Sequence, residues 1–244
     1  MFAPDAPLRT NRLIALDLAR TGAIVGMVAF HFTFDLALFR FIPADTVSQP
    51  FWYYFARTVA GSFLFLSGVC LWLAHGQGIR WRAFGWRFAK LAAAAALVSV
   101  ASFWLVPGGP ILFGILHSLA LSSLITLACL RLPWAVTLAL AMGIFALGWV
   151  DRSASFDSLW LIWLGLAENR PMMGDYVPLI PWLAPSLAGL ALAKAAGVER
   201  WKGRPPTRLT NALAFPGRHS LIIYLIHQPL LISLFYTWVW ATQP

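Results

Sequence analysis

Four ionisable side chains lie in one long apolar stretch near the start of the chain. The stretch, residues 12–39, carries Asp17, Arg20, His31 and Asp35. At about 100° per residue of an α-helix, His31 falls roughly 20° from Arg20 and each aspartate roughly 60°, so all four point the same way. A histidine that titrates near neutral pH can take a proton from an attacking amine or hydroxyl, and a neighbouring carboxylate can orient its ring. Because lipid cannot solvate such a polar stripe, we interpret it as the floor of a site or as an internal polar lock.

The composition indicates what must position these groups. Hydrophobic residues make up 60% of the chain, charged residues only 11%, and the mean hydropathy is +0.73, whereas roughly a quarter of the residues in soluble domains are charged. We therefore predict an all-α, polytopic membrane bundle formed by one integral domain, residues 1–244. The net charge of +9 then reflects basic cytoplasmic loops, and nucleic acid is not expected as a partner. Cys70 and Cys129 lie in apolar runs and are interpreted as packing residues.

Apolar segments predict about seven transmembrane spans. One further apolar piece, residues 159–167, is too short to cross a bilayer and is expected as an interfacial or re-entrant helix. The turn sequence at 107–110 splits residues 91–130 into two spans, while basic segments at 79–90 and 199–218 mark the cytoplasmic side. The other expected spans cover residues 12–39, 51–78, 134–150, 178–194 and 220–241.

The distribution of basic residues predicts the orientation. With the N-terminus inside and the C-terminus outside, all but four of the 18 Lys and Arg residues fall on the cytoplasmic side. Such an excess of basic residues is typical of cytoplasmic loops. The exceptions on the outer side are Arg40, Arg57, Arg152 and Arg170.

Helical rise brings titratable groups from three spans to one level. Counted from residue 14, His31 lies about 25 Å across a hydrocarbon core of about 30 Å, and Arg57 and His117 each lie about 9 Å below the outer ends of their spans. Asp175 and Tyr176, just before the sixth span, are expected above them. This shared depth predicts a site in the outer part of the membrane.

Structural roles remain open for several of these residues. Arg57 could form an ion pair with Asp35, because intramembrane charges commonly pair. Asp17 and Arg20 are spaced for a local ion pair within one helix. The GxxxG pattern at 22–26 favours close helix packing and also permits a homodimer.

Five segments of the chain resemble one family. They resemble the heparan-alpha-glucosaminide N-acetyltransferase-like bacterial membrane proteins, part of the wider transmembrane acyltransferase superfamily. The resemblance implies transfer of an acetyl or other acyl group from cytoplasmic acyl-CoA to an amine or hydroxyl of a sugar or glycan-like acceptor at the outer face. It also implies the bacterial cytoplasmic (inner) membrane as the location. The segments are RLIALDLARTGAIVGMVAFHFTFDL, FLFLSGVCLWL, GILHSLALSSLI, DYVPLIPWL and GRHSLIIYLIHQPLL.

The resemblance, the shared depth and the distribution of charge together suggest roles for individual residues. Catalytic roles are expected for His31, Asp35 and His117, with His31 as the active centre. Expected substrate-binding residues are Arg57, Asp175, Tyr176, Arg218, Ser220, Tyr224 and His227. Expected binding residues for acetyl-CoA are Asp17, Arg20, Arg80 and Arg82, and its phosphates are expected at the basic cytoplasmic clusters Arg80, Arg82, Arg87, Lys90, Arg200, Lys202, Arg204 and Arg208.

Other functions are compatible with the residues alone. A proton-coupled transporter or flippase would use the same intramembrane histidine, aspartate and arginine groups as relays. A pair of haem-ligating histidines is a weaker idea, and we expect neither metal nor haem. The expected partners are acyl-CoA, an amino-sugar or glycan acceptor and membrane lipid. Whether His31 acts as a base or becomes acylated stays open at this point.

Overall fold

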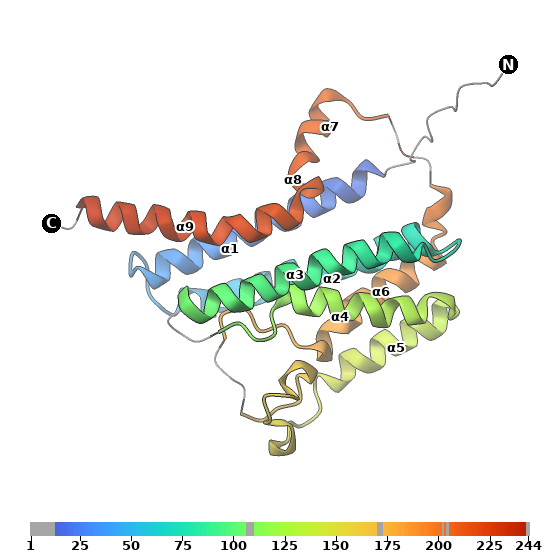
Figure 1. Cartoon of the computed structure of the whole chain (residues 1–244), viewed down its shortest axis with the longest axis horizontal. Coiled ribbons are helices and arrows are strands. Elements are labelled where there is room, and N and C mark those ends of the chain that lie inside the picture. The colour runs from blue at the N-terminus through green and yellow to red at the C-terminus, as the bar shows by residue number, and fades with distance from the viewer. Residues whose placement is uncertain (1–12, 106–109, 170–172, 202, 204, 243–244) are drawn as a thin grey trace.

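The computed structural model describes residues 13–105, 110–169, 173–201, 203 and 205–242. Within them the regular elements are α-helices joined by loops and short 3₁₀ turns, which confirms the all-helical prediction (Figure 1). The helices are α1 (Ile14–Leu38), α2 (Pro50–His75), α3 (Trp81–Leu105), α4 (Ile115–Ala128), α5 (Trp134–Leu147), α6 (Leu179–Ala195), α7 (Arg208–Leu213), α8 (Phe215–Arg218) and α9 (Ser220–Thr242).

Four of the described helices are long and apolar enough to cross a bilayer, namely α1, α2, α3 and α9. Three further apolar helical segments, 115–131, 134–147 and 179–195, are shorter. At about 1.5 Å per residue, the 14 residues of α5 cover only about 21 Å of a core about 30 Å thick. The chain is thus an integral membrane protein, but the count of seven full spans is not confirmed.

The start of α3 corrects the expected loop at 79–90. Gly78, whose φ is 155°, separates α2 from α3, and α3 begins at Trp81. Arg82, Arg87 and Lys90 therefore lie in the first turns of a helix. Their long aliphatic stems can run along apolar surface while the charged heads reach polar surroundings, so basic residues need not end a span.

Two other segments also differ from expectation. The basic loop at 199–218 contains α7 and α8, and the Thr207 hydroxyl caps α7 by accepting a hydrogen bond from the Thr210 N–H at 3.2 Å. The apolar piece at 159–167 forms only a 3₁₀ turn, Ile162–Leu164. The expected turn at 107–110 and residues Arg12, Arg170, Lys202 and Arg204 fall largely or wholly outside the described residues.

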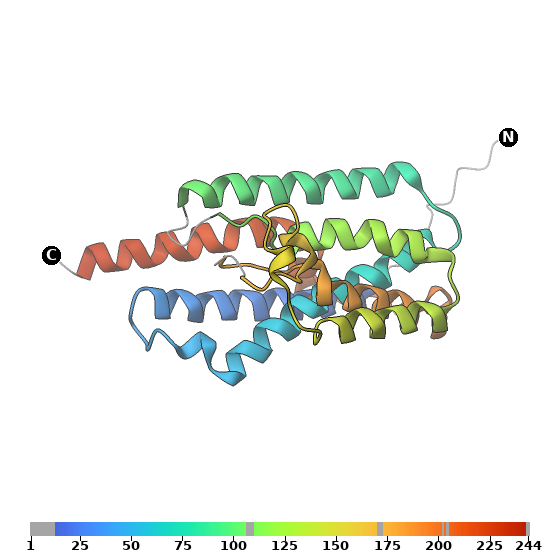
Figure 2. The same cartoon turned by 90° about the horizontal axis from the view of Figure 1, so that it is seen from below.

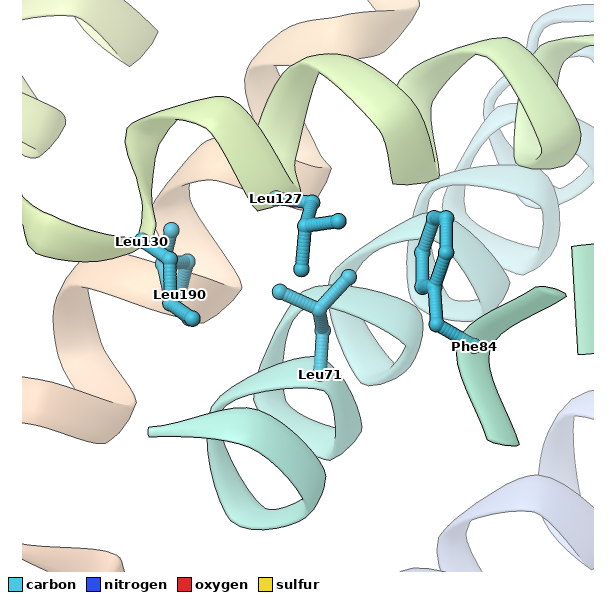
Figure 3. Packing of buried hydrophobic residues seen from close by; sticks show 5 residues of the cluster. All are labelled: Leu71, Phe84, Leu127, Leu130 and Leu190. Atoms are coloured by element: carbon cyan, nitrogen blue, oxygen red, sulfur yellow. The ribbon is translucent and has the colours of Figure 1, made fainter. Parts of the chain in front are cut away.

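Glycine allows the closest helix contacts. A Cβ on Gly68 of α2 would collide with the carbonyl of Ser186 on α6, and one on Gly189 of α6 would collide with the carbonyl of Phe65. Beside this contact, a buried cluster ties α2 and α6 to α3 and the end of α4 (Figure 3). Its members are Leu71, Phe84, Leu127, Leu130 and Leu190.

The arrangement of the long helices leaves a polar region between them. α1 packs against α2, α8 and α9, whereas α3 packs mainly on α4. Figure 2 shows α3 along one side of the bundle, α1 and α2 on the other, and α4 and α9 between them. The first turns of α9 therefore lie close to the start of α4, where the polar groups described below meet.

Candidate active site

An outer polar cluster forms where α1 faces α9, and its members are His31, Asp35, His227 and Gln228. The rings of His31 and His227 are 4.8 Å apart between centroids, at 65° to each other. Gln228 donates a hydrogen bond from Nε2 to Oδ1 of Asp35 at 2.9 Å. Asp35 is fully buried and His227 is 8% exposed. Two expected site residues of α1 thus meet the late polar residues of α9.

Four buried polar atoms in this cluster have no hydrogen-bond partner among the described residues: His31 Nδ1, Asp35 Oδ2, His227 Nε2 and Gln228 Oε1. His227 Nδ1 lies 2.6 Å from the carbonyl oxygen of Tyr224. Because a carbonyl only accepts, that nitrogen carries the proton and the Nε2 atom of neutral His227 is an acceptor. The carboxylate and amide oxygens also accept. Buried polar atoms without partners are costly, so N–H or O–H donors would stabilise this cluster.

A second polar group lies one helical turn further toward the start of α9. The Tyr224 ring is 5.6 Å from that of His227. Its hydroxyl donates to Oδ2 of Asp175 at 3.0 Å, and the Ile115 N–H at the start of α4 donates to the same oxygen at 3.0 Å. Asp175 thereby joins the loop before α6 to both α4 and α9.

An inner cleft of about 370 Å³ lies among α1, α2, α3, α4 and α9. Arg87 donates from Nη2 to the Ser67 hydroxyl at 2.9 Å. Three cations and no carboxylate belong to the described residues that line the cleft, and the rest of the lining is mostly aliphatic and aromatic. Such a surface favours an anionic ligand. The polar lining residues are Arg20, Ser67, Arg87, Lys90, Ser220 and Tyr224.

Comparison with known proteins decides the family. The family model described as heparan-alpha-glucosaminide N-acetyltransferase, catalytic, matches residues 12–229. The chain belongs to this family. Membership confirms the resemblance found in the sequence and implies a membrane acetyltransferase. No curated protein and no solved structure matches the chain.

In this N-acetyltransferase family member, one set of expected site residues holds the helices together. The side chain of Asp17 is 3% exposed and pairs with Arg20 at 3.3 Å and with Arg218 at 3.2 Å. Arg218 also donates to Asn211 at 2.9 Å, and Arg20 to the Cys70 sulfur at 2.8 Å. The local Asp17–Arg20 ion pair is therefore present. Arg20 alone of the three lines the inner cleft.

Arg57 is not where the sequence places it. It is exposed on α2, with its guanidinium carbon 3.5 Å from the centroid of the Tyr53 ring. Asp35 pairs with Gln228 instead, so the suggested Arg57–Asp35 ion pair is wrong. A cation held on an aromatic face at the outer end of a span is typical of an interfacial belt.

His117 and Tyr176 make local contacts. His117 accepts from the Gly114 N–H at 3.2 Å through Nδ1, and its Nε2 lies 3.2 Å from the Ser99 hydroxyl. The Tyr176 hydroxyl donates to the Ile162 carbonyl at 2.5 Å, bracing the loop before α6. These contacts link α3 with α4 and fix the outer loop, and they do not join either residue to His31.

Of the residues expected to bind the donor, Arg20 lines the cleft, whereas Arg80 and Arg82 are exposed. Arg80 donates to the Ala74 carbonyl at 3.0 Å. Arg87 and Lys90 reach the cleft because they stand on α3 and not in a loop. Ser67 and the role of Gln228 were not predicted from the sequence, although Gln228 directly follows His227 in the segment GRHSLIIYLIHQPLL.

Proposed function

We propose that the chain moves an acetyl group from cytoplasmic acetyl-CoA, or a related acyl-CoA, to an amine or hydroxyl of a sugar or glycan-like acceptor at the outer face. One observation carries the proposal: a cation-lined cleft and a cluster of unpaired hydrogen-bond acceptors lie along the same helix, joined by Tyr224 and His227. Family membership favours group transfer over proton-coupled transport.

The donor half of the proposal rests on charge. CoA is anionic at its phosphates, and Arg87 and Lys90 can form charge-assisted hydrogen bonds with them, with Arg20 on the facing helix. A volume of about 370 Å³ is within the range of small-molecule sites, and the apolar lining suits the thin pantetheine arm. The thioester would then point along the cleft toward Tyr224.

The acceptor half of the proposal rests on the outer polar cluster. In the proposed reaction the His31 imidazole takes the proton whose loss makes the acceptor nucleophilic. The Asp35 carboxylate, one helical turn away, stabilises the positive charge that the imidazole then carries. An amine offers more N–H donors than a hydroxyl offers O–H donors, and the unpaired acceptors are on Asp35, His227 and Gln228. Within the proposed acceptor class we therefore favour an amino sugar. In the bacterial inner membrane, the N-terminus would lie on the cytoplasmic side and the C-terminus on the outer side.

Reconstituted vesicles test this function. Acetyl-CoA labelled in the acetyl group is supplied on one face and glucosamine on the other, with glucose as the acceptor that lacks the amine. We expect labelled N-acetylglucosamine and free CoA in equal amounts, and little product with glucose. If no acyl-CoA is consumed and the vesicles instead accumulate the sugar, the chain is a transporter and the proposal is wrong.

A further inference from the structure

Two hydrogen-bond donors from different helices converge on one oxygen at the edge of the inner cleft. The Tyr224 hydroxyl of α9 and the Ile115 N–H of α4 each lie 3.0 Å from Asp175 Oδ2. Tyr224 and Ile115 both line the cleft that contains Arg87 and Lys90. A Cβ on Gly114 would lie 2.5 Å from the same oxygen, so the glycine permits this close approach.

We propose that the Tyr224 hydroxyl and the Ile115 N–H form an oxyanion hole for the acetyl carbonyl, and that the Asp175 carboxylate occupies this hole until the donor binds. The inference rests on the proposed function and names the groups that would stabilise its transition state. Such catalysis requires donors at 2.7–3.1 Å from the developing oxyanion. The two donors here each lie 3.0 Å from Asp175 Oδ2, so an oxyanion in the place of that oxygen would meet this requirement.

The surroundings support an anion at this point. Ile115 is the first residue of α4, a helix of 14 residues, and the start of a helix carries partial positive charge and free N–H groups. A carboxylate oxygen already lies between the two donors, which shows that they can hold a negatively charged oxygen together. Tyr224 packs with Leu91 and Leu116 in one apolar cluster, so its hydroxyl lies beside an apolar part of the cleft lining.

The reaction step balances with these groups. The acceptor nitrogen attacks the thioester carbon and forms a C–N bond, while the carbonyl π electrons move to oxygen. Tyr224 and the Ile115 N–H hold that oxyanion, and the imidazole takes one proton from nitrogen. The C=O bond then re-forms and the C–S bond breaks, so that CoA leaves as a thiolate and receives the proton as free thiol.

A purely structural role for the same contacts predicts different behaviour. If Asp175 only caps α4, removal of the Tyr224 hydroxyl changes stability slightly and leaves the chemical step alone. As an oxyanion donor, Tyr224 affects kcat by a factor of about 10²–10³, while the affinity for CoA stays the same. Binding and turnover therefore separate the two roles.

The test uses Tyr224→Phe in the full-length protein, with Tyr236→Phe as control because Tyr236 is an exposed tyrosine on the same helix. We expect kcat to fall at least a hundred-fold in Tyr224→Phe with unchanged CoA affinity, and neither quantity to change in Tyr236→Phe. Infrared spectra of bound carbonyl-labelled acetyl-CoA should show a lowered C=O frequency in the wild type that moves back toward the free value in Tyr224→Phe.

The second donor is tested at the backbone. Ile115 is the first helical position, where proline is tolerated, so Ile115→Pro removes the N–H without breaking α4. Ile115→Val keeps the N–H and reports the loss of packing. We expect a further loss of kcat and carbonyl shift only in the proline variant.

The outcomes distinguish this inference from the proposed function. A wild type that transfers acetyl groups while Tyr224→Phe keeps its kcat and its carbonyl frequency overturns the oxyanion hole alone. A wild type without transfer, under conditions in which CoA binds, overturns the proposed function first and this inference with it.

Discussion

The inner cleft and the outer polar cluster present opposite hydrogen-bonding character. Among the described residues, the cleft offers three cationic side chains and no carboxylate, whereas three of the four unpaired atoms of the polar cluster accept hydrogen bonds. The first surface suits phosphates and the second suits an amine or hydroxyl. Such a contrast within one helical bundle indicates two ligands of opposite polarity that meet near Tyr224 and His227.

The two sites also differ in how they are built. The outer polar cluster belongs to α1 and α9, which pack directly on each other. The inner cleft is lined by residues of α1, α2, α3, α4 and α9. The polar cluster is therefore held by the contact of two helices, whereas the cleft depends on the arrangement of five.

Removal of the His31 imidazole from the outer polar cluster should have the largest effect on kcat. We expect His31→Ala to lose at least the roughly hundred-fold in kcat that a positioned base supplies, with unchanged CoA affinity. His219→Ala is the matched control, because His219 is exposed and its Nδ1 lies 3.0 Å from the Phe215 carbonyl oxygen of the preceding turn. Initial rates of acetyl transfer by both variants measure the effect, and near-normal transfer by the His31 variant would remove this residue from the chemistry.

The next largest effect is expected for a cation of the inner cleft, and it concerns the KM for acetyl-CoA instead of kcat. We expect Arg87→Gln to raise the KM for acetyl-CoA roughly ten- to hundred-fold, because a hydrogen bond to a charged group contributes about 1.5–3 kcal/mol. Arg131→Gln, an exposed basic residue outside this cleft, should leave KM unchanged. Equal KM values for the two variants would show that the contrast between the sites does not concern the donor.

Substitution of Gln228 tests the outer polar cluster through a smaller expected effect. Gln228→Leu removes the donor that holds Asp35 and one of the free acceptors. Loss of that charged hydrogen bond should raise the KM for the acceptor by roughly ten-fold, with little change in the KM for acetyl-CoA. Thr237→Val, an exposed position on the same helix, serves as control. A larger change in the donor constant than in the acceptor constant would reverse our assignment of the two sites.

Periodicity located much of the candidate site, because it acts within one helix. The 3.6-residue repeat of α1 put Asp17, Arg20, His31 and Asp35 on one face, and these residues contact α8, the inner cleft and α9. The partner of Asp35 could not be found in the same way. The depth of Arg57 in the membrane, estimated from helical rise, favoured Arg57 as that partner. However, the rotation of α2 about its own axis turns Arg57 outward, and an estimate of depth contains no information on that rotation.

Hydropathy was informative about helices and less so about their lengths. It found every long helix, yet it treated the charges at 79–90 as a loop, whereas long basic side chains let α3 start at Trp81. It also assigned full spans to segments that form the short α4, α5 and α6. Consequently, the sequence did not predict that the start of α4 would meet Asp175 and Tyr224 beside the cleft.

The smallest expected effect concerns Glu199, a carboxylate outside both sites. The Trp72 Nε1–H donates to Glu199 at 2.8 Å, and this hydrogen bond, followed by one from the residue's own backbone N–H, holds the pKa of Glu199 below its usual value of 4.5. A lowered pKa in the folded state means that the contribution to stability is present above about pH 4.5 and is lost as the pH falls through the folded value. We therefore expect Glu199→Gln to lower Tm slightly at pH 7, and the difference from the wild type to disappear on acidification toward the folded pKa. Thermal unfolding in detergent between pH 7 and pH 4 measures it, and a difference that grows as the pH falls would contradict the sign of this linkage.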